Sequence, residues 1–387
     1  MNEALPFRQF VVKTAARCNL ACDYCYVYEL RDQGWRNRPR LIADETVTAL
    51  GRWLRAHAEQ AGLRTLDIVL HGGEPLLVGP ARLDAIATDL RAALAGVAEP
   101  RFTLQTNGVL LDERCAEVLL AHRIRVGVSL DGDEVAHDRH RRGPDGGGSH
   151  AATVRGIELL RRPRYRPLYG GLLATIDLAN DPVATYEELL AHAPPMIDLL
   201  LPHATWEYPP PGARTGETAH ADWLIAVFDR WYGAPVRETR VRLLEDLVDL
   251  TLGRAVRSET LGLSPAGSVV IETDGTFERQ DALKAAYDGA AATGFDVFRH
   301  DPATVLAASG FGGLGADAGE PAEPSPTCRR CPVLRTCGGG LRAHRYHPAN
   351  GFDNPSVYCA DLRALIDHVR TRVHADLRAL VGPERRR

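Results

Sequence analysis

The sequence predicts an α/β fold built on a parallel sheet, and three observations support this. Short β-rich segments alternate with amphipathic helical segments through the first two thirds of the 387 residues. Six such alternations are typical of a parallel sheet. The polar motifs described below each follow a β-rich segment directly, as expected where sites form at the carboxyl ends of parallel strands. The expected strands cover residues 8–13, 66–72, 101–106, 125–130, 168–176 and 196–201.

The remainder of the chain reads as three further kinds of segment. Two helices are expected at 219–232 and 239–253, and residues 268–279 read as a hairpin that turns at Asp274-Gly275. Residues 310–327 are rich in Gly and Pro and predict an irregular connection. We therefore expect three units, listed here by residue range: 1–210, a barrel; 211–310, bridging helices and a hairpin; and 311–387, a cysteine-rich module.

Composition narrows the classes of function. The net charge is −4, so no polybasic character points to nucleic acid or an acidic membrane as a partner. No signal peptide and no apolar stretch long enough to span a bilayer is present, which predicts a cytoplasmic protein. Its eight Cys are then expected to be metal ligands or reduced thiols. Nearly all basic residues are Arg, with Lys only at 13 and 284, and we attribute this bias to a GC-rich genome.

The first cysteine group follows the first expected strand. Cys18, Cys22 and Cys25 form a CxxxCxxC pattern, which can hold three irons of a 4Fe–4S cluster and leave the fourth open to an outside ligand. An open coordination position is what a catalytic metal site needs. The alternatives are a zinc site or a set of buried thiols, but zinc prefers four protein ligands and paired CxxC units.

These residues resemble the radical S-adenosylmethionine (SAM) superfamily, whose signature is CxxxCx(aromatic)C, with Tyr24 at the aromatic position. The motifs "HGGEP" (71–75), "QTNG" (105–108) and "SLDG" (129–132) follow in the expected order. The resemblance covers roughly residues 7–200 and implies a partial (β/α)6 TIM-like barrel. It also implies that residues of these motifs contact SAM, together with one Arg of "HDRHRRG". We choose Arg142 for this contact, and Arg139 and Arg141 are the alternatives. The implied SAM-binding residues are Tyr24, Gly72, Gly73, Glu74, Pro75, Gln105, Asn107, Ser129 and Arg142.

The implied chemistry is radical cleavage of SAM at the open iron. The resulting 5′-deoxyadenosyl radical takes a hydrogen atom from the substrate, and the protein supplies orientation and water exclusion. Asp131 is the candidate catalytic residue, as a proton acceptor, although a turn residue or a SAM ligand would fit the same position.

The second cysteine group lies near the C-terminus. Cys328, Cys331, Cys337 and Cys359 can fully ligate either a zinc ion or a 4Fe–4S cluster. The pattern "CRRCPVLRTCGGG" is similar to the SPASM domain, which holds auxiliary clusters in radical SAM enzymes that modify peptides, and this favours a cluster. A full SPASM pattern has seven Cys and two clusters. Gln280 and Leu341 stand at two of the missing positions, so the resemblance implies one auxiliary 4Fe–4S cluster.

The longer resemblance is to FxsB-type radical SAM/SPASM proteins. It rests on "SVVIETDGTFERQDALK", "GFDVFRH" and "GFDNPSVYCADL" as well as the cysteines. It implies an enzyme that forms cyclophanes in a ribosomally synthesised precursor peptide by joining an aromatic ring carbon to a side-chain β-carbon. An electron donor such as flavodoxin or ferredoxin is implied as a second partner. The alternatives are a sulfatase-type maturase, which produces formylglycine, and a non-catalytic iron–sulfur or zinc protein.

Overall fold

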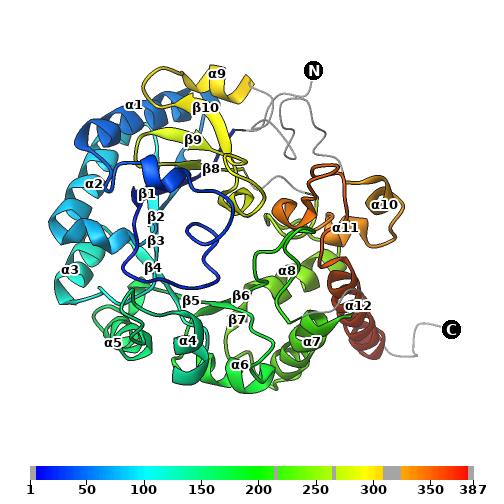
Figure 1. The fold of residues 1–387 in the computed structure, drawn as a ribbon. Coiled ribbons are helices and arrows are strands. Elements are labelled where there is room, and N and C mark those ends of the chain that lie inside the picture. Colours follow the sequence, from blue (N-terminus) through cyan, green and yellow to red (C-terminus); the bar gives the residue numbers. More distant parts are fainter. Residues whose placement is uncertain (1–5, 213–216, 264–266, 308–323, 382–387) are drawn as a thin grey trace.

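The computed structural model describes residues 6–212, 217–263, 267–307 and 324–381, and all statements below concern these residues. Its centre is one ten-stranded sheet that curves into an open barrel (Figure 1). Neighbouring strands from β1 to β6 are parallel, as the sequence predicts. These strands are β1 (Gln9–Ala15), β2 (Thr65–Gly72), β3 (Glu99–Thr106), β4 (Arg125–Ser129), β5 (Tyr169–Thr175) and β6 (Met196–Leu200).

Helices cover the outer face of the barrel (Figure 1). Side chains alternate along β2, so that Leu66, Ile68 and Leu70 are fully buried in the hydrophobic core while the residues between them are partly buried. The Asp112 side chain caps α3 by accepting from the amide of Cys115. The covering helices are α1 (Asp44–Ala61), α2 (Gly79–Leu94), α3 (Glu113–Ala121), α4 (Glu134–His140), α5 (His150–Arg161) and α6 (Pro182–Ala191).

The predicted hairpin is present, but it is not a separate unit. Strands β8 (Ser268–Ile271) and β9 (Thr276–Glu278) are antiparallel and turn at Gly275, whose φ is +82°. Strand β8 also pairs with β1 in parallel, and β10 (Ala292–Asp296) follows β9, so the hairpin extends the barrel beyond β1. At the other edge the short β7 (Arg240–Val241) pairs with β6. The sheet order is β10-β9-β8-β1-β2-β3-β4-β5-β6-β7.

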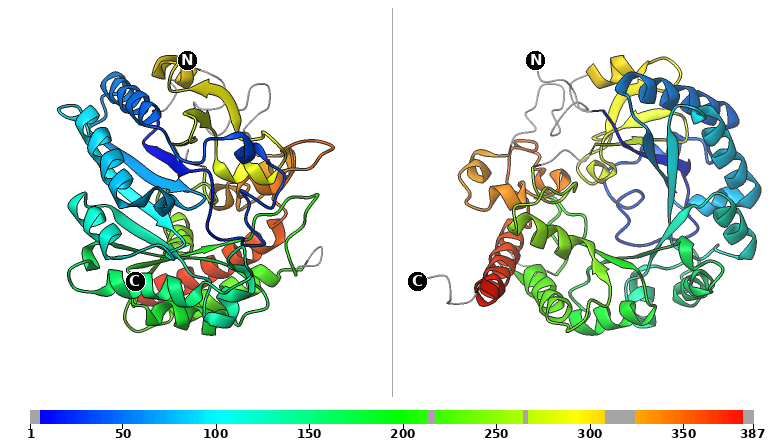
Figure 2. Two further views of the ribbon diagram at one scale, coloured as in Figure 1. Left: turned by 60° about the vertical axis from the view of Figure 1, so that its left-hand side comes forward. Right: turned by 180° about the vertical axis from the view of Figure 1, so that it is seen from behind.

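The C-terminal segment lies against helices from the middle of the chain. Helix α12 (Cys359–Val381) contacts α7 (Ala219–Tyr232) and α8 (Arg242–Thr251), as both views of Figure 2 show. None of the described helices is long and apolar enough to cross a bilayer. Most of the predicted 310–327 connection lies outside the described residues. The remaining helical elements are η1 (Gly34–Asn37), η2 (Pro75–Val78), η3 (Arg166–Leu168), η4 (Asp281–Ala285), α9 (Pro302–Ala307), α10 (Pro326–Arg329), α11 (Leu334–Cys337) and η5 (Arg342–Arg345).

Candidate active site at the mouth of the barrel

The three-cysteine loop follows β1 and crosses one end of the barrel (Figure 1). A tight turn holds it, with the amide of Cys25 donating to the carbonyl of Cys22 at 3.1 Å. Burial raises the pKa of the Cys18 thiol to about 12 and that of Cys22 to about 11. Such thiols stay protonated at neutral pH unless a cationic centre binds them. Three partly buried thiols on one loop, close enough to interact electrostatically, therefore fit the cluster that the sequence predicts.

The glycines of "HGGEP" are required by contacts within the protein itself. A Cβ on Gly72 would lie 2.3 Å from the carbonyl oxygen of Ala15, and one on Gly73 would lie 2.4 Å from that of Arg17. The amide of Gly73 donates to Ala15 at 2.9 Å. The sequence predicts these glycines for close approach to SAM. The structure shows a second reason for glycine at these positions: their backbone lies directly against the start of the cysteine loop, where a side chain would not fit.

Glu74 is fully buried and ties two strand ends together. Its carboxylate accepts from the Thr106 hydroxyl at 2.7 Å and from the amides of Leu76 and Asn107 at 2.9 Å. Burial raises the pKa of Glu74 to about 7, although these three donors favour the ionised form. Pro75 begins η2 and is also buried. The contacts show Glu74 positioning the loop, and its predicted contact with SAM stays a prediction.

The other predicted SAM residues lie at the ends of β3 and β4. The side-chain amide of Gln105 donates from Nε2 to the Ser129 hydroxyl at 3.1 Å, which links the two strands. Asn107 Nδ2 donates to Asn19 at 2.8 Å and lies 3.7 Å from Cys18 Sγ. Asn107 is therefore beside the cysteine loop, as the motif order predicts.

Asp131 is the centre of a buried group at the end of β4. It accepts from Arg141 Nε at 2.7 Å, from the amide of Thr175 at 2.9 Å, and from the Tyr24 hydroxyl. Burial would raise the pKa of Asp131, but the charge of Arg141 holds it below its ordinary value. Of the competing arginines, Arg141 is thus the one inside the barrel. Arg142 is exposed and donates to the carbonyl of Asp138 at 2.6 Å.

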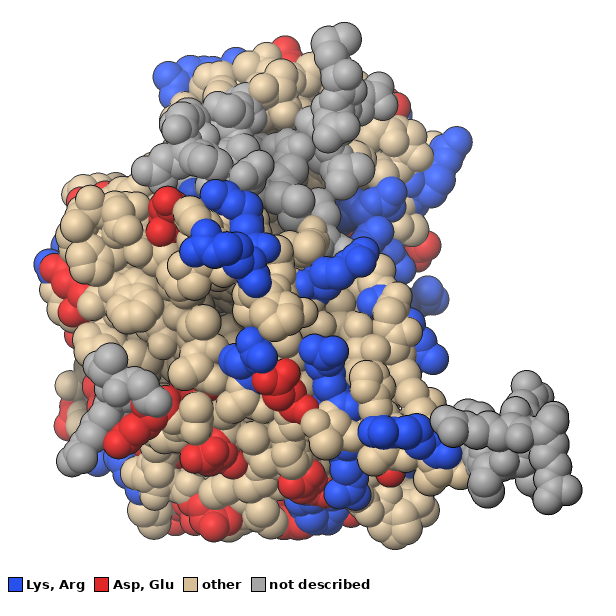
Figure 3. Space-filling model, turned by 90° about the vertical axis from the view of Figure 1, so that its right-hand side faces the viewer, with Lys and Arg blue, Asp and Glu red and all other residues tan. Residues whose placement is uncertain are grey.

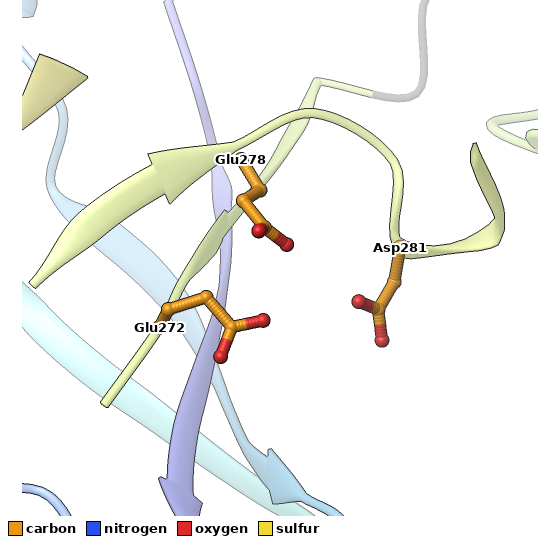
Figure 4. A group of neighbouring side chains, drawn as sticks. All are labelled: Glu272, Glu278 and Asp281. Atoms are coloured by element: carbon orange, nitrogen blue, oxygen red, sulfur yellow. The ribbon is translucent and has the colours of Figure 1, made fainter. Parts of the chain in front are cut away.

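A second buried polar group, which the sequence did not predict, surrounds the two lysines of the chain. The carboxylates of Glu272, Glu278 and Asp281 point toward one another (Figure 4). Their oxygens lie within 4.8 Å of one another, as metal ligands would. The ammonium of Lys284 lies within 2.9 Å of all three carboxylates, so a protein cation already occupies this position.

Lys13 connects this lysine–carboxylate cluster to the strand ends. Its ammonium pairs with Asp281 and lies 3.3 Å from Nδ1 of His71, the residue before the two glycines. The Tyr26 hydroxyl, next to Cys25, also donates to Asp281 at 2.7 Å. Burial alone would raise the pKa of Asp281, but Lys13 and Lys284 hold it well below its ordinary value. The only signal for this cluster in the sequence was the rarity of Lys.

The four C-terminal thiols lie near enough to one another to interact electrostatically. Burial raises the pKa of the Cys337 thiol to about 11, and its electrostatic neighbours include Cys328 and Cys359. Cys359, which begins α12, is in turn close enough to Cys328 and Cys331 for their charges to act on it. This donor set fits the predicted four-thiolate cluster.

Arg345 shapes the loop that carries Cys337. Its guanidinium donates to the carbonyls of Gly338, Gly339 and Gly340 at 2.8, 3.0 and 3.1 Å. A Cβ on Gly338 would lie 1.8 Å from the carbonyl oxygen of Gly262. The sequence did not predict a role for Arg345. Backbone carbonyls accept its hydrogen bonds, and such contacts leave no recognisable pattern of side chains in a sequence.

Protein side chains fill the region of the missing SPASM ligands. Leu341, at one missing cysteine position, packs with Ala282 and Ala343 in a small buried apolar cluster. Gln280, at another, immediately precedes η4. Four cysteines and this apolar packing are the pattern expected for one auxiliary cluster.

Comparisons with known proteins agree with this site. Residues 12–177 match the family model of the radical SAM superfamily. The chain is 28% identical over 362 residues to the serine-type anaerobic sulfatase-maturating enzyme of Klebsiella aerogenes, covering 88% of this chain and 80% of that enzyme. It is 26% identical over 157 residues to the cysteine-type anaerobic sulfatase-maturating enzyme of Clostridium perfringens (strain 13 / Type A), covering 41% of each.

Solved structures show the same fold. Native anSMEcpe with bound AdoMet and Cp18Cys peptide superimposes with a TM-score of 0.75 at 19% identity, covering 97% of this chain and 99% of that chain. Streptococcus suis SuiB bound to precursor peptide SuiA gives a TM-score of 0.59 at 13% identity, covering 92% and 77%.

The barrel and its three-cysteine loop thus define an enzyme that binds a 4Fe–4S cluster and SAM. The protein is a radical SAM enzyme, with its radical SAM domain over residues 12–177 and sulfatase-maturating enzymes among its relatives. The fold prediction is confirmed; the relationship to cyclophane-forming enzymes stays a prediction.

The first test concerns the cysteine loop. We expect replacement of Cys18, Cys22 and Cys25 by Ala to abolish formation of 5′-deoxyadenosine from SAM, because no ligands remain for the cluster. The measurement is anaerobic reconstitution followed by chromatography after dithionite reduction. Cys115→Ala is the matched control, since this buried thiol lies on α3, outside both cysteine groups. Turnover at the wild-type rate in the triple variant would disprove the assignment.

The second test concerns Lys284. Removing one partner of a buried ion pair leaves an uncompensated charge and costs about 3–5 kcal/mol, so Lys284→Met should lower the free energy of unfolding by that order. Arg254→Met breaks an exposed pair with Asp249 and should cost less than about 1 kcal/mol. Anaerobic urea unfolding followed by circular dichroism compares the two. Equal midpoints would show that the cluster does not stabilise the fold.

Proposed function

We propose that this enzyme is a maturase that oxidises a side chain of a peptide or protein substrate by two electrons, in the manner of the sulfatase-maturating enzymes. The observation that carries the proposal is similarity along nearly the whole chain, 28% identity over 88% of it, to a serine-type maturase. A span of this length extends well beyond the radical SAM domain of residues 12–177.

The proposed reaction converts a Ser or Cys side chain of the substrate to formylglycine. When bound, the cluster and SAM supply the 5′-deoxyadenosyl radical, which takes one hydrogen atom from the substrate Cβ. For Ser, loss of one further electron and one proton gives the aldehyde, so the side chain loses two hydrogens in all. For Cys, the same losses give a thioaldehyde, and water then replaces the sulfur, which leaves as hydrogen sulfide.

The chain's own residues orient the reactants and handle the proton. Gly73, Asn107 and Ser129 lie on the strand ends around the cysteine loop, where we propose that they hold SAM. Asp131 is a buried carboxylate and Asp281 a partly buried one; neighbouring cations lower the pKa of both, and they are the candidates for accepting the proton. In the structure Asp131 is fully engaged by Arg141, Tyr24 and Thr175, so its contacts also suit a positioning residue.

The second candidate function is cyclophane formation on a precursor peptide. The observation that favours it is the loss of one set of SPASM ligands, with Leu341 packed where a cysteine would lie. A β-carbon radical would add to an aromatic ring carbon, and the ring would regain aromaticity by releasing one electron and one proton. This reaction also removes two hydrogens from the substrate.

An acidic redox protein, such as a flavodoxin or ferredoxin, is the proposed electron donor. Figure 3 shows Lys and Arg side chains gathered on the face that carries the C-terminal module. Exposed arginines near the four cysteines include Arg330, Arg335 and Arg363, and the Arg363 guanidinium lies 4.0 Å from Cys331 Sγ. Because the chain as a whole is negative, this basic face would orient a negatively charged partner.

The third test distinguishes the two reactions. The enzyme is incubated with SAM and a reductant and with either a sulfatase-type peptide containing Ser or a precursor peptide encoded beside its gene. We expect the serine peptide to lose two hydrogens, to react with a hydrazide, and to fragment normally along its backbone in tandem mass spectrometry. A precursor peptide that loses two hydrogens, does not react with hydrazide, and resists fragmentation between two residues would favour the cyclophane. Turnover of neither peptide would contradict both.

The fourth test counts clusters. Three and four cysteine ligands predict two 4Fe–4S clusters, or about eight iron and eight sulfide per chain. Replacing Cys337 and Cys359 should halve the iron while leaving some SAM cleavage without substrate. About twelve iron would show that other ligands build a third cluster. About four iron with bound zinc would show a structural zinc module.

A further inference from the structure

A row of buried and partly buried aromatic rings joins the two cysteine sites. We call the row the aromatic chain, and it consists of Tyr26, His203, His344 and Tyr358. Ring centroids are 4.5 Å apart from Tyr26 to His203, 5.8 Å from His203 to His344, and 4.9 Å from His344 to Tyr358.

Each end of the aromatic chain is bonded to a proposed cluster ligand. Tyr26 directly follows Cys25 on the barrel loop, and Tyr358 directly precedes Cys359 of the C-terminal module. A second link bypasses the ring of His344. The Tyr358 hydroxyl donates at 2.7 Å to the carbonyl of Pro202, the residue before His203. The amide of Val357 likewise donates to the carbonyl of His344 at 2.8 Å. The residues that carry the rings are therefore connected by covalent and hydrogen bonds as well as by tilted and edge-to-face ring contacts.

The two histidines are poorly explained by packing alone. Nδ1 of His203 and Nε2 of His344 are buried without a protein hydrogen-bond partner among the described residues. Burial lowers the pKa of His203 to about 4 and that of His344 well below its ordinary value, so both rings are neutral. A buried polar nitrogen without a partner is costly, and Leu or Phe would fill the same space without that cost.

The aromatic chain also runs beside the region of the missing cluster. Leu341, at a missing ligand position, is three residues before His344, and Asp281, which accepts from Tyr26, directly follows Gln280 at another. The packing that fills this region consists of Ala282, Leu341 and Ala343. Saturated side chains of this kind are a poor medium for electron tunnelling, whereas conjugated rings in contact are a better one.

We propose that the aromatic chain carries single electrons between the three-cysteine site and the four-cysteine site. This inference rests on the proposed function, because both sites must hold clusters. The step is a one-electron transfer in which no bond forms or breaks. The electron that the oxidised substrate releases passes along the rings, the oxidised auxiliary 4Fe–4S cluster accepts it, and the Tyr26 proton stays on its oxygen.

The experiment follows electron exchange between the clusters without a peptide. Holoenzyme is photoreduced by a flash in the presence of deazaflavin, and absorbance is recorded anaerobically without SAM. Bimolecular reduction should be followed by a slower phase whose rate does not depend on protein concentration. We expect this phase to slow by an order of magnitude in His203→Leu and in His344→Leu, which remove a ring.

Ring-retaining and off-path variants are the controls. His203→Phe keeps a ring in place and should keep the rate near that of the wild type. His220→Leu removes a ring on α7 that lies 5.1 Å from Tyr358 but is not one of the four rings of the aromatic chain, so it should leave the rate unchanged. Iron content, circular dichroism and the electron paramagnetic resonance signals of both clusters confirm that each variant is loaded and folded. Should His203→Leu lose a cluster, Tyr358→Leu compared with Tyr358→Phe gives the same contrast at the other end.

The outcomes separate this inference from the proposed function. Wild-type enzyme with about four iron per chain would contradict the proposed function. Wild-type enzyme with both clusters but no concentration-independent phase would overturn the inference alone. An unchanged phase in the ring-removing variants would also overturn it.

Discussion

The site depends on one group of buried charges, the lysine–carboxylate cluster. Lys284 pairs with three carboxylates, those of Glu272 just after β8, Glu278 in β9 and Asp281 in η4, and Lys13 of β1 also pairs with Asp281. Arg38, on the loop between η1 and α1, adds a third cation through Glu278 at 2.5 Å. Buried charges hold their positions only when paired, because each unpaired charge is strongly disfavoured. The cluster therefore fixes the hairpin, the first strand and the cysteine loop relative to one another.

Close backbone packing also fixes the cysteine loop itself. Gly72 and Gly73 let the end of β2 lie against Ala15 and Arg17, and Glu74 then binds the end of β3. Three strand ends are thus connected through one short motif without a large side chain between them. The surface predicted to bind SAM is built by backbone contacts inside the protein, so a substitution at Gly73 would disturb the cysteine loop itself.

Local patterns in the sequence were sufficient to predict much of the fold and both groups of cysteines. Alternating hydrophobicity located β1 to β6, and the cysteine spacings identified both thiol groups, because these features lie within short stretches of sequence. Pairing of β8 with β1 could not be predicted, since it joins residues about 260 positions apart without a helical crossover pattern. The buried ion pair between Arg141 and Asp131 could not be predicted for a related reason, and the predicted SAM contact of Arg142 stays a prediction. Adjacent arginines have the same local pattern, and only tertiary contacts decide which one points inward.

The aromatic chain and the missing SPASM ligands concern one physical problem. An enzyme that removes two electrons from its substrate through a one-electron radical must pass the second electron elsewhere. An additional cluster between two others would shorten each transfer, but here its place is taken by Ala282, Leu341 and Ala343. Electron transfer would then have to cross the apolar region in one long step or use side chains with low-lying π orbitals. Neutral His203 and His344, in tilted and edge contacts between two tyrosines, supply such orbitals without introducing a buried charge that would alter the potential of either cluster.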